Sequence, residues 1–340
     1  MKHQLTPELE QKIKALVDDV DTPHHVHLER MIQTLVKISK ENSDVHDVNI
    51  ISNTLRELLE SYRVFLPYRD VRKVCLFGSA RTKPSHPAYQ ISEEFATKIT
   101  AKGFMVITGA GGGIMEAGNK GSEVNMSFGA NILLPFEQTP NPYIDGDAKL
   151  VSFKYFFNRK LTFIKESDAT VLSPGGFGTH DEAFEVLTLV QTGRCAPRPI
   201  VLLSAPGDSY WDTWTDLVRK ELLGQQYISD DDLFLFRNLH SAEEAVNHIV
   251  QFYKKYHSIR YHGPLTVIRI NSPLSERSLA DMNQKFASLL VTGSIEQVNP
   301  DDLPFDNEVY PGIPRLVLHY NRSTFGRLYE IIDYLNHVAD

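Results

Sequence analysis

Cysteine is scarce in this chain of 340 residues, which contains only Cys75 and Cys195. Both lie in apolar or strand-like surroundings, so the sequence supports neither a disulfide framework nor a cysteine-based metal site. No apolar run approaches the length of a membrane span, and residues 1–10 lack the apolar core of a secretory signal. These absences predict a cytoplasmic protein.

An excess of positive charge is also lacking. The chain has 35 Lys and Arg residues against 43 Asp and Glu residues, which gives a net charge of −8. This balance argues against broad binding to nucleic acid or to an anionic membrane, so any phosphate-binding site must be local. Hydrophobic residues make up 42% of the chain, enough for a sizeable core in one large or two modest domains.

The residue pattern changes twice along the chain and predicts three segments. Residues 1–66 have the periodicity of helices, with apolar stripes at Leu9, Ile13 and Leu16 and at Ile51, Leu55, Leu58 and Leu59. Residues 67–258 alternate between strand and helix patterns, which predicts an α/β doubly wound, Rossmann-like parallel sheet covered on both faces. Residues 259–340 predict a small α+β extension. The expected strands are 71–77, 104–108, 131–134, 168–172, 200–203, 265–270 and 315–319.

The most informative motif is the glycine-rich run Ser173–Glu182. It follows the expected strand 168–172 and opens an expected helix, so its backbone N–H groups have no intrahelical partners and carry the positive end of the helix dipole. An anion docked there is stabilised by geometry alone. The sequence therefore predicts a phosphate cradle made of Gly175, Gly176, Gly178 and Thr179.

Two further loops leave expected strands at the same edge of the sheet. Ser79 follows the first strand and offers a hydroxyl to a ligand, although an ordinary turn is equally compatible with this loop. After the second strand, glycines permit close approach of backbone amides to a phosphate or ribose, at Gly109, Gly111, Gly112 and Gly113. Ligands of open parallel sheets bind at the carboxyl ends of the strands, so we expect these loops to converge on one site.

Neither glycine loop fits the commoner nucleotide fingerprints. Ile114 stands where the dinucleotide pattern requires Gly or Ala, which disfavours NAD. The run after Gly113 comes close to a phosphate-binding P-loop, but Asn119 displaces the lysine and Gly121 replaces the magnesium-binding hydroxyl, which disfavours NTP hydrolysis. No lysine stands in a recognisable pyridoxal-binding setting. The cluster His24, His25 and His27 lacks partners at metal-ligand spacing.

The pattern Pro-Gly-Gly-x-Gly-Thr-x-x-Glu at residues 174–182, with Arg159 and Lys160 upstream, resembles the signature of the LOG ("lonely guy") family. The resemblance covers roughly residues 70–255. Members of this family, often mislabelled lysine decarboxylases, cut the N-glycosidic bond of nucleoside 5′-monophosphates. The resemblance implies this hydrolysis, without metal or cofactor, and favours the larger bacterial nucleotide nucleosidases with terminal extensions. It also implies an AMP-like small-molecule substrate and a homodimer or higher homo-oligomer.

Two residues are predicted to be catalytic. Glu182 would hold a ribose hydroxyl, offset positive charge on the sugar and orient or deprotonate water, while its alternative role is that of a capping-box partner for Thr179. By the resemblance, Arg159 is catalytic and would bind phosphate or assist the departing base. Lys160 is left unassigned. His180 is expected to be an exposed residue, and Asp181 an acid at the helix start.

The base pocket is the least defined part of the prediction. On the segment 153–163 we expect Phe153, Phe156 or Phe157, and Leu161 to face inward and Asn158 to point elsewhere. The aromatic residues would either stack a purine or belong to the core. The proline-rich loop Pro135–Tyr143 would form a lid over the base.

Two other functions stay open at this stage. The fold would serve as a nucleotide or alarmone sensor if it bound ligand without cleaving it, although the intact pair Arg159 and Glu182 argues against that. The second open function is transfer of the ribosyl group to an acceptor other than water.

Overall fold

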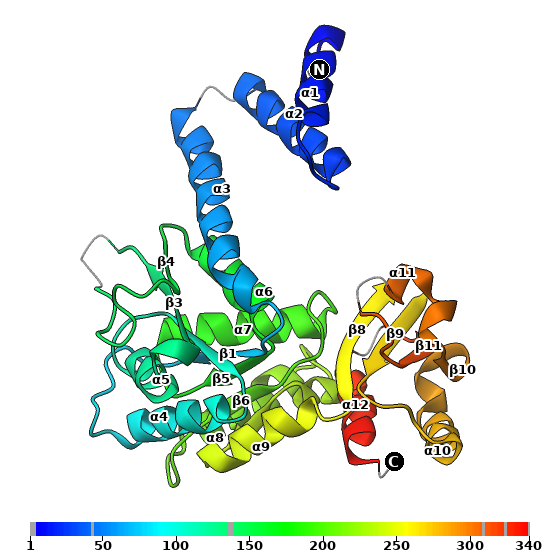
Figure 1. Ribbon diagram of the computed structural model, residues 1–340. Coiled ribbons are helices and arrows are strands. Elements are labelled where there is room, and N and C mark those ends of the chain that lie inside the picture. The colour runs from blue at the N-terminus through cyan, green and yellow to red at the C-terminus, as the bar shows by residue number, and fades with distance from the viewer. Residues whose placement is uncertain (1–4, 42–43, 135–138, 308–309, 323–324, 339–340) are drawn as a thin grey trace. The chain divides into compact units, whose positions relative to one another are not determined.

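The computed structural model describes residues 5–41, 44–134, 139–307, 310–322 and 325–338 (Figure 1). The chain separates into two compact units, Met1–Tyr62 and Arg63–Asp340. Among the described residues, no helix is both long enough and apolar enough to cross a bilayer. The cytoplasmic location stays a prediction.

The first unit is helical. It contains α1 (Pro7–Asp18), α2 (His25–Glu41) and most of α3 (Val45–Phe65). Thr6 caps α1 by accepting a hydrogen bond from the backbone N–H of Leu9 at 3.4 Å. Ile13 and Val17 are buried in a small core to which Leu9 also contributes. The predicted apolar stripe is therefore confirmed for Leu9 and Ile13. It is wrong for Leu16, whose side chain is 56% exposed, because the buried face of the helix continues to Val17.

The second unit is built on a seven-stranded sheet in the order β4-β3-β2-β1-β5-β6-β7. All neighbouring strands are parallel. The strands are β1 (Lys73–Phe77), β2 (Met105–Thr108), β3 (Ser127–Ile132), β4 (Leu150–Phe153), β5 (Ala169–Leu172), β6 (Ile200–Leu203) and β7 (Arg237–Leu239). This architecture confirms the predicted α/β, Rossmann-like fold. The strand expected at 131–134 is β3, which begins and ends earlier, at Ser127 and Ile132. The sequence analysis does not predict β4 and β7.

Helices cover both faces of this sheet (Figure 1). They are α4 (Pro87–Thr100), α5 (Ile114–Ser122), α6 (Phe156–Glu166), α7 (Phe177–Gln191), α8 (Tyr210–Leu217) and α9 (Ala242–Phe252). Side chains of β1 alternate between the two faces, as a strand requires. Val74 and Leu76 share a core with α4 and α9, whereas Cys75 and Phe77 share the other core with α6 and α7.

The C-terminal part forms a second sheet, four-stranded and antiparallel, in the order β10-β11-β9-β8. Its strands are β8 (Tyr256–His262), β9 (Leu265–Ile270), β10 (Leu290–Val298) and β11 (Arg315–Tyr320), with helices α10 (Glu276–Phe286), α11 (Pro304–Asn307) and α12 (Leu328–His337). Its apolar side chains join the core that contains Phe77. The predicted segment boundary after residue 258 falls inside β8, and the three-segment division stays a prediction.

Candidate functional site

The strand order reverses between β1 and β5, and a cavity of about 740 Å³ lies at the carboxyl ends of these two strands. This is the place where open parallel sheets bind ligands. Its wall brings together most of the residues predicted as a site, namely Ser79, Gly109, Arg159, Gly175, Gly176, Gly178, Thr179 and Glu182. They come from loops after three strands and from α6 and α7.

The start of α7 faces this cavity without a side-chain cap. Gly176 is the N-cap residue, and its carbonyl accepts hydrogen bonds from the N–H groups of Thr179 and His180 at 3.0 and 3.2 Å. The first N–H groups of the helix remain available to an anion. Thr179 is the third residue of the helix rather than its N-cap, so the capping-box alternative for Thr179 and Glu182 does not hold.

Glycine is required at position 175 of the glycine-rich run Ser173–Glu182. A Cβ on Gly175 would lie 2.1 Å from Thr179 Oγ1 and 2.9 Å from the backbone nitrogen of Ser79. That nitrogen donates to the carbonyl oxygen of Pro174 at 3.1 Å, which joins the loops after β1 and β5. A Cβ on Gly176 or Gly178 would meet nothing within 4 Å, so both glycines border open space.

The second glycine loop is divided between two roles. Gly109 lines the cavity, but Gly111, Gly112 and Gly113 do not. Gly113 has φ of +63°, and a Cβ there would lie 2.2 Å from the carbonyl oxygen of Ser79. Gly112 and Gly113 therefore let the loop after β2 pack against the loop after β1, and none of Gly111, Gly112 and Gly113 lines the cavity.

Glu182 carries a buried carboxyl group. Its side chain is only 5% exposed, and Lys160 Nζ lies 3.5 Å from its Oε2. Burial raises the pKa of Glu182, although Lys160 and Arg159 oppose that shift. Lys160 also pairs with Asp181 at 2.9 Å and approaches Glu185 at 3.9 Å. Lys160, unassigned from the sequence, thus fixes α6 against the acidic side of α7.

Arg159 presents an unpaired guanidinium to the same cavity. It lies over the rings of Phe156 and Phe163, 5.0 and 5.6 Å from their centroids. Among the described residues, no carboxylate lies within ion-pair distance of Arg159, and its buried Nε has no hydrogen-bond partner. Burial lowers the pKa of Arg159, while Glu182 acts in the opposite direction. Such a group is suited to receive an anionic or electron-rich ligand.

Comparison with known proteins agrees with this geometry. A family model described as "possible lysine decarboxylase" matches residues 107–249. The rice (Oryza sativa subsp. japonica) protein named cytokinin riboside 5′-monophosphate phosphoribohydrolase LOG is 25% identical over 192 residues, which span 54% of this chain and 75% of the relative. The Arabidopsis thaliana protein LOG1, of the same name, is 26% identical over 195 residues, 55% of this chain and 87% of the relative. Over these residues the chain is similar to the LOG family.

Among solved structures, that of TM1055 is 24% identical and covers 53% of this chain and 99% of its own, with a TM-score of 0.40. The residues that the family model matches, 107–249, lie in the part of the chain that contains the parallel sheet. Much of the rest of the chain lies outside the matched residues.

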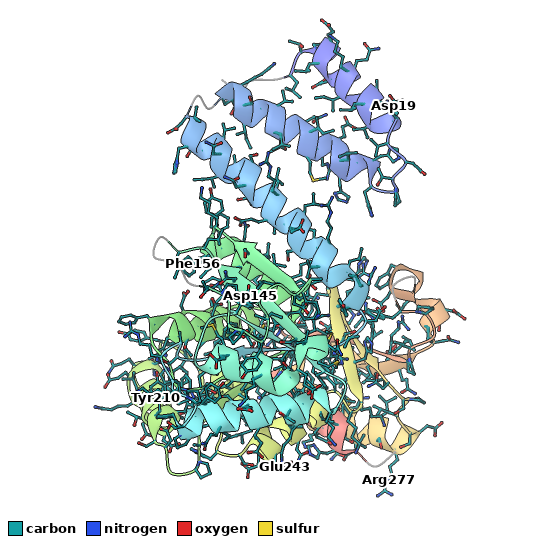
Figure 2. All side chains as sticks on the ribbon, turned by 60° about the vertical axis from the view of Figure 1, so that its left-hand side comes forward. Asp19, Asp145, Phe156, Tyr210, Glu243 and Arg277 are labelled. Atoms are coloured by element: carbon teal, nitrogen blue, oxygen red, sulfur yellow. The ribbon has the colours of Figure 1, made fainter. Side chains whose placement is uncertain are left out.

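The orientation of α6 differs from the sequence-based prediction. Phe156, Phe157 and Leu161 are exposed, whereas Asn158 is buried. Of the three phenylalanines considered for the base, only Phe156, labelled in Figure 2, is among the residues that line the cavity. Phe153 is fully buried in β4 and belongs to the core. The prediction assigned the inward face by the spacing of apolar residues, whereas the helix buries the polar side chains of Asn158 and Thr162.

A histidine and a tyrosine that the sequence analysis did not assign also belong to the site. His180 lines the cavity and is half-buried rather than exposed, and its Nε2 lies 2.7 Å from the hydroxyl of Tyr210. That hydroxyl donates to the carbonyl oxygen of Gly175, so His180 Nε2 must be the donor in the pair. Tyr210, at the start of α8 (Figure 2), thus holds the glycine loop from a distant part of the sequence.

The predicted lid is only partly described. Pro135–Gln138 lie outside the described residues. Further along the same loop, the side-chain amide of Asn141 donates to the carbonyl oxygens of Ala110 and Gly111 at 3.1 and 3.0 Å. The described part of this loop therefore anchors the second glycine loop.

Proposed function

We propose that this protein is a member of the LOG family and hydrolyses the N-glycosidic bond of nucleoside 5′-monophosphates to free base and ribose 5-phosphate. One observation carries the proposal. Three groups surround one cavity, namely the buried carboxylate of Glu182, the unpaired guanidinium of Arg159 and the uncapped N-terminus of α7. The names of the rice and Arabidopsis relatives point to the same reaction.

The phosphate of the substrate would bind at the start of α7. Free N–H groups, the helix dipole and the open space beside Gly176 and Gly178 all suit a dianion there. Thr179, the third residue of the helix, is buried at the same end. The 740 Å³ cavity is within the range of volumes that enclose small ligands.

The reaction breaks the bond between the anomeric carbon and the base nitrogen and forms a bond from that carbon to a water oxygen. The electron pair of the broken bond leaves with the base, and the sugar becomes positively charged in the transition state. Glu182, ionised, would offset this charge and accept a proton from the attacking water. Arg159 would donate hydrogen bonds to the phosphate or to the departing base.

The remaining wall of the cavity is largely apolar and would contact the base. Met115, Ile132, Leu134 and Phe156 contribute to it. Phe177 also lines the cavity and is 96% exposed, so its ring has almost no packing partners in the chain. These side chains allow stacking but carry no donor or acceptor pattern that selects one base, so the preferred base is left to the assay. The homo-oligomer also remains a prediction.

The test measures free base and ribose 5-phosphate released from AMP, GMP, CMP, UMP and an isopentenyl-adenine nucleotide. Glu182→Gln and Arg159→Met should each reduce kcat by at least roughly 100-fold, as expected for groups that act in the transition state. Glu185→Gln is the matched control, because Glu185 also approaches Lys160 from α7 but does not line the cavity. No release of base by the wild type, together with retained nucleotide binding, would refute hydrolysis and favour a sensor.

A further inference from the structure

A second cavity, of about 490 Å³, lies at the opposite edge of the parallel sheet. Its wall includes Arg72, Asp168 and Arg198, which stand just before β1, β5 and β6. The other side is formed by residues around β8, among them His257. The cavity therefore lies between the amino ends of the parallel strands and the C-terminal sheet, within residues 63–340.

Arg198 is the unusual member of this wall. It is only 8% exposed, and its guanidinium donates a hydrogen bond to Ser167 Oγ at 3.1 Å. Its Nε is buried without an acceptor, and no carboxylate of the described residues lies within ion-pair distance of it. The nearby Cys195 is no counter-ion, because burial raises the pKa of its thiol. A buried guanidinium without an anion is unfavourable, and it lines a cavity that has room for one.

Two further arginines lie around the same cavity. Arg72 is fixed by an ion pair to Asp168 at 2.9 Å, a hydrogen bond to the carbonyl oxygen of His257 at 3.1 Å and stacking 3.7 Å above the ring of Tyr253. Arg69 is exposed on the wall and forms no ion pair with the described residues.

Two carboxylates share this wall. Asp168 is already engaged by Arg72 and by the backbone N–H of Lys73 at 2.9 Å, and Asp70 is exposed. Three guanidinium groups against two carboxylates leave a local positive charge in a chain whose net charge is −8.

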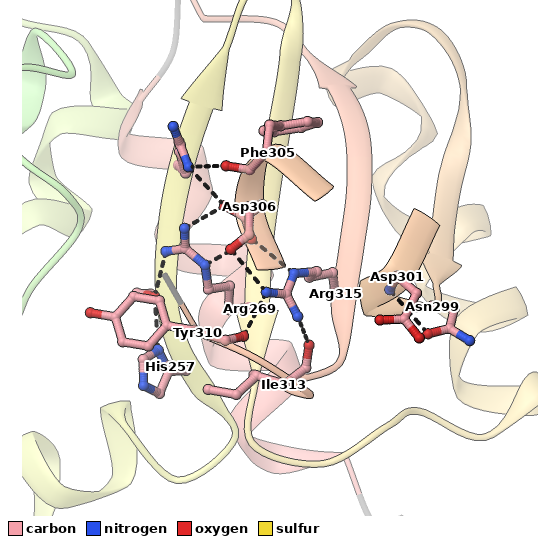
Figure 3. Close-up of polar contacts among 11 residues, drawn as sticks. His257, Arg269, Asn299, Asp301, Phe305, Asp306, Tyr310, Ile313 and Arg315 are labelled. Carbon is pink, nitrogen blue, oxygen red and sulfur yellow. Dashed lines mark hydrogen bonds and ion pairs between the residues drawn. The ribbon is translucent and has the colours of Figure 1, made fainter. Parts of the chain in front are cut away.

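The C-terminal sheet adds to this positive charge. Asp306 is fully buried and accepts hydrogen bonds from the Nε atoms of Arg269 and Arg315 at 3.0 and 2.8 Å, while Arg260 lies 3.6 Å away (Figure 3). Arg315 also donates to the carbonyl oxygen of Tyr310 at 2.7 Å. The cluster therefore anchors Tyr310, which lines the cavity, and has more arginines than carboxylates.

We propose that this second cavity binds a small phosphorylated molecule, with Arg198 and Arg72 holding the phosphate and the exposed Arg69 adding positive charge at the same wall. A guanidinium group donates two parallel hydrogen bonds to the oxygens of a phosphate. Several arginines around one cavity therefore suit a phosphate better than a single carboxylate. The cavity is much larger than inorganic phosphate, and the rings of Tyr253 and Tyr310 flank the space for an organic group. The site is separate from the proposed active site, since β1 and β5 run between the two cavities.

The test uses pyrophosphate as the probe and hydrogen–deuterium exchange of the full chain as the readout. Binding should protect amides in segments 69–73, 166–169 and 254–258. Arg69→Ala, which changes an exposed side chain, should weaken this protection roughly tenfold in apparent affinity, and Arg198→Gln should abolish it. Arg277→Ala, exposed on α10 (Figure 2), is the matched control and should bind as the wild type does.

Protection confined to segments 78–81 and 175–182 would overturn the proposal, because pyrophosphate would then bind only in the first cavity. Wild-type binding by both Arg69→Ala and Arg198→Gln would also overturn it. These outcomes are independent of base release, so a failed hydrolase assay and a failed second site are distinguishable. The Arg69→Ala result does not depend on whether Arg198→Gln folds.

Discussion

Replacement of Gly175 by alanine tests whether the glycine loop is shaped by contact with its neighbours. The added Cβ would lie 2.1 Å from Oγ1 and 2.8 Å from Cβ of Thr179, and 2.9 Å from the backbone nitrogen of Ser79. Thr179 is buried, and the third contact is with backbone, so neither neighbour can simply swing away. Overpacking of this kind costs about 1–3 kcal/mol, and we expect the upper half of that range.

Gly178→Ala is the matched comparison, because a Cβ there meets nothing within 4 Å. Alanine also favours helix over glycine by up to about 1 kcal/mol, so this variant should be at least as stable as the wild type. Thermal unfolding followed by circular dichroism should place Gly175→Ala roughly 4–12 °C below the wild type and at least as far below Gly178→Ala. Equal melting temperatures would refute the claim that Gly175 is required by the contact between the loops.

Three further predictions concern polar groups. Tyr210→Phe removes the hydroxyl that bonds to His180 and Gly175, and urea unfolding should show a loss of about 1 kcal/mol; unchanged stability and activity would contradict a role in holding the loop. Asp306→Asn leaves buried guanidinium groups without their anion and should cost about 3–5 kcal/mol at pH 7 in the same assay, whereas a loss below 1 kcal/mol would contradict this reading. Because burial raises the pKa of Glu182 in the folded state, its stabilising contribution is complete at low pH and is lost as the pH rises through that raised pKa. Glu182→Gln should therefore melt higher than the wild type at pH 8 but not at pH 4, while wild-type hydrolysis increases with pH over the same interval; a difference in melting temperature that does not change with pH would contradict the assignment.

The parallel sheet could be predicted because its central strands are short apolar runs separated by helical periodicity. The glycine loop before α7 could be placed for the same reason, since a strand, a glycine run and a helix in succession leave few alternatives. Strand β7, with the sequence Arg237-Asn-Leu239, has no apolar run and could not be recognised. Strands β8 and β10 carry mixed polar and apolar residues and depend on pairing within the C-terminal sheet.

The finer details of the site depend on contacts between distant residues. Gly113 was expected to bind ligand, but its positive φ and its approach to Ser79 become visible only when the two loops are placed side by side. The hydrogen bond from Tyr210 to Gly175 joins residues 35 positions apart and has no local sequence signal. The inward face of α6 was assigned from hydrophobicity alone, which Phe156 and the buried Asn158 contradict.

The most direct test of the proposed function compares AMP with adenosine as substrates of the wild-type protein. If the start of α7 holds the phosphate while Glu182 acts at the sugar, AMP should yield adenine and ribose 5-phosphate in equal amounts, and adenosine should react at least roughly 100-fold more slowly in kcat/KM. Equal cleavage of the two compounds would contradict the phosphate site at α7. Absence of adenine from AMP and from every other nucleoside 5′-monophosphate would contradict the hydrolase itself.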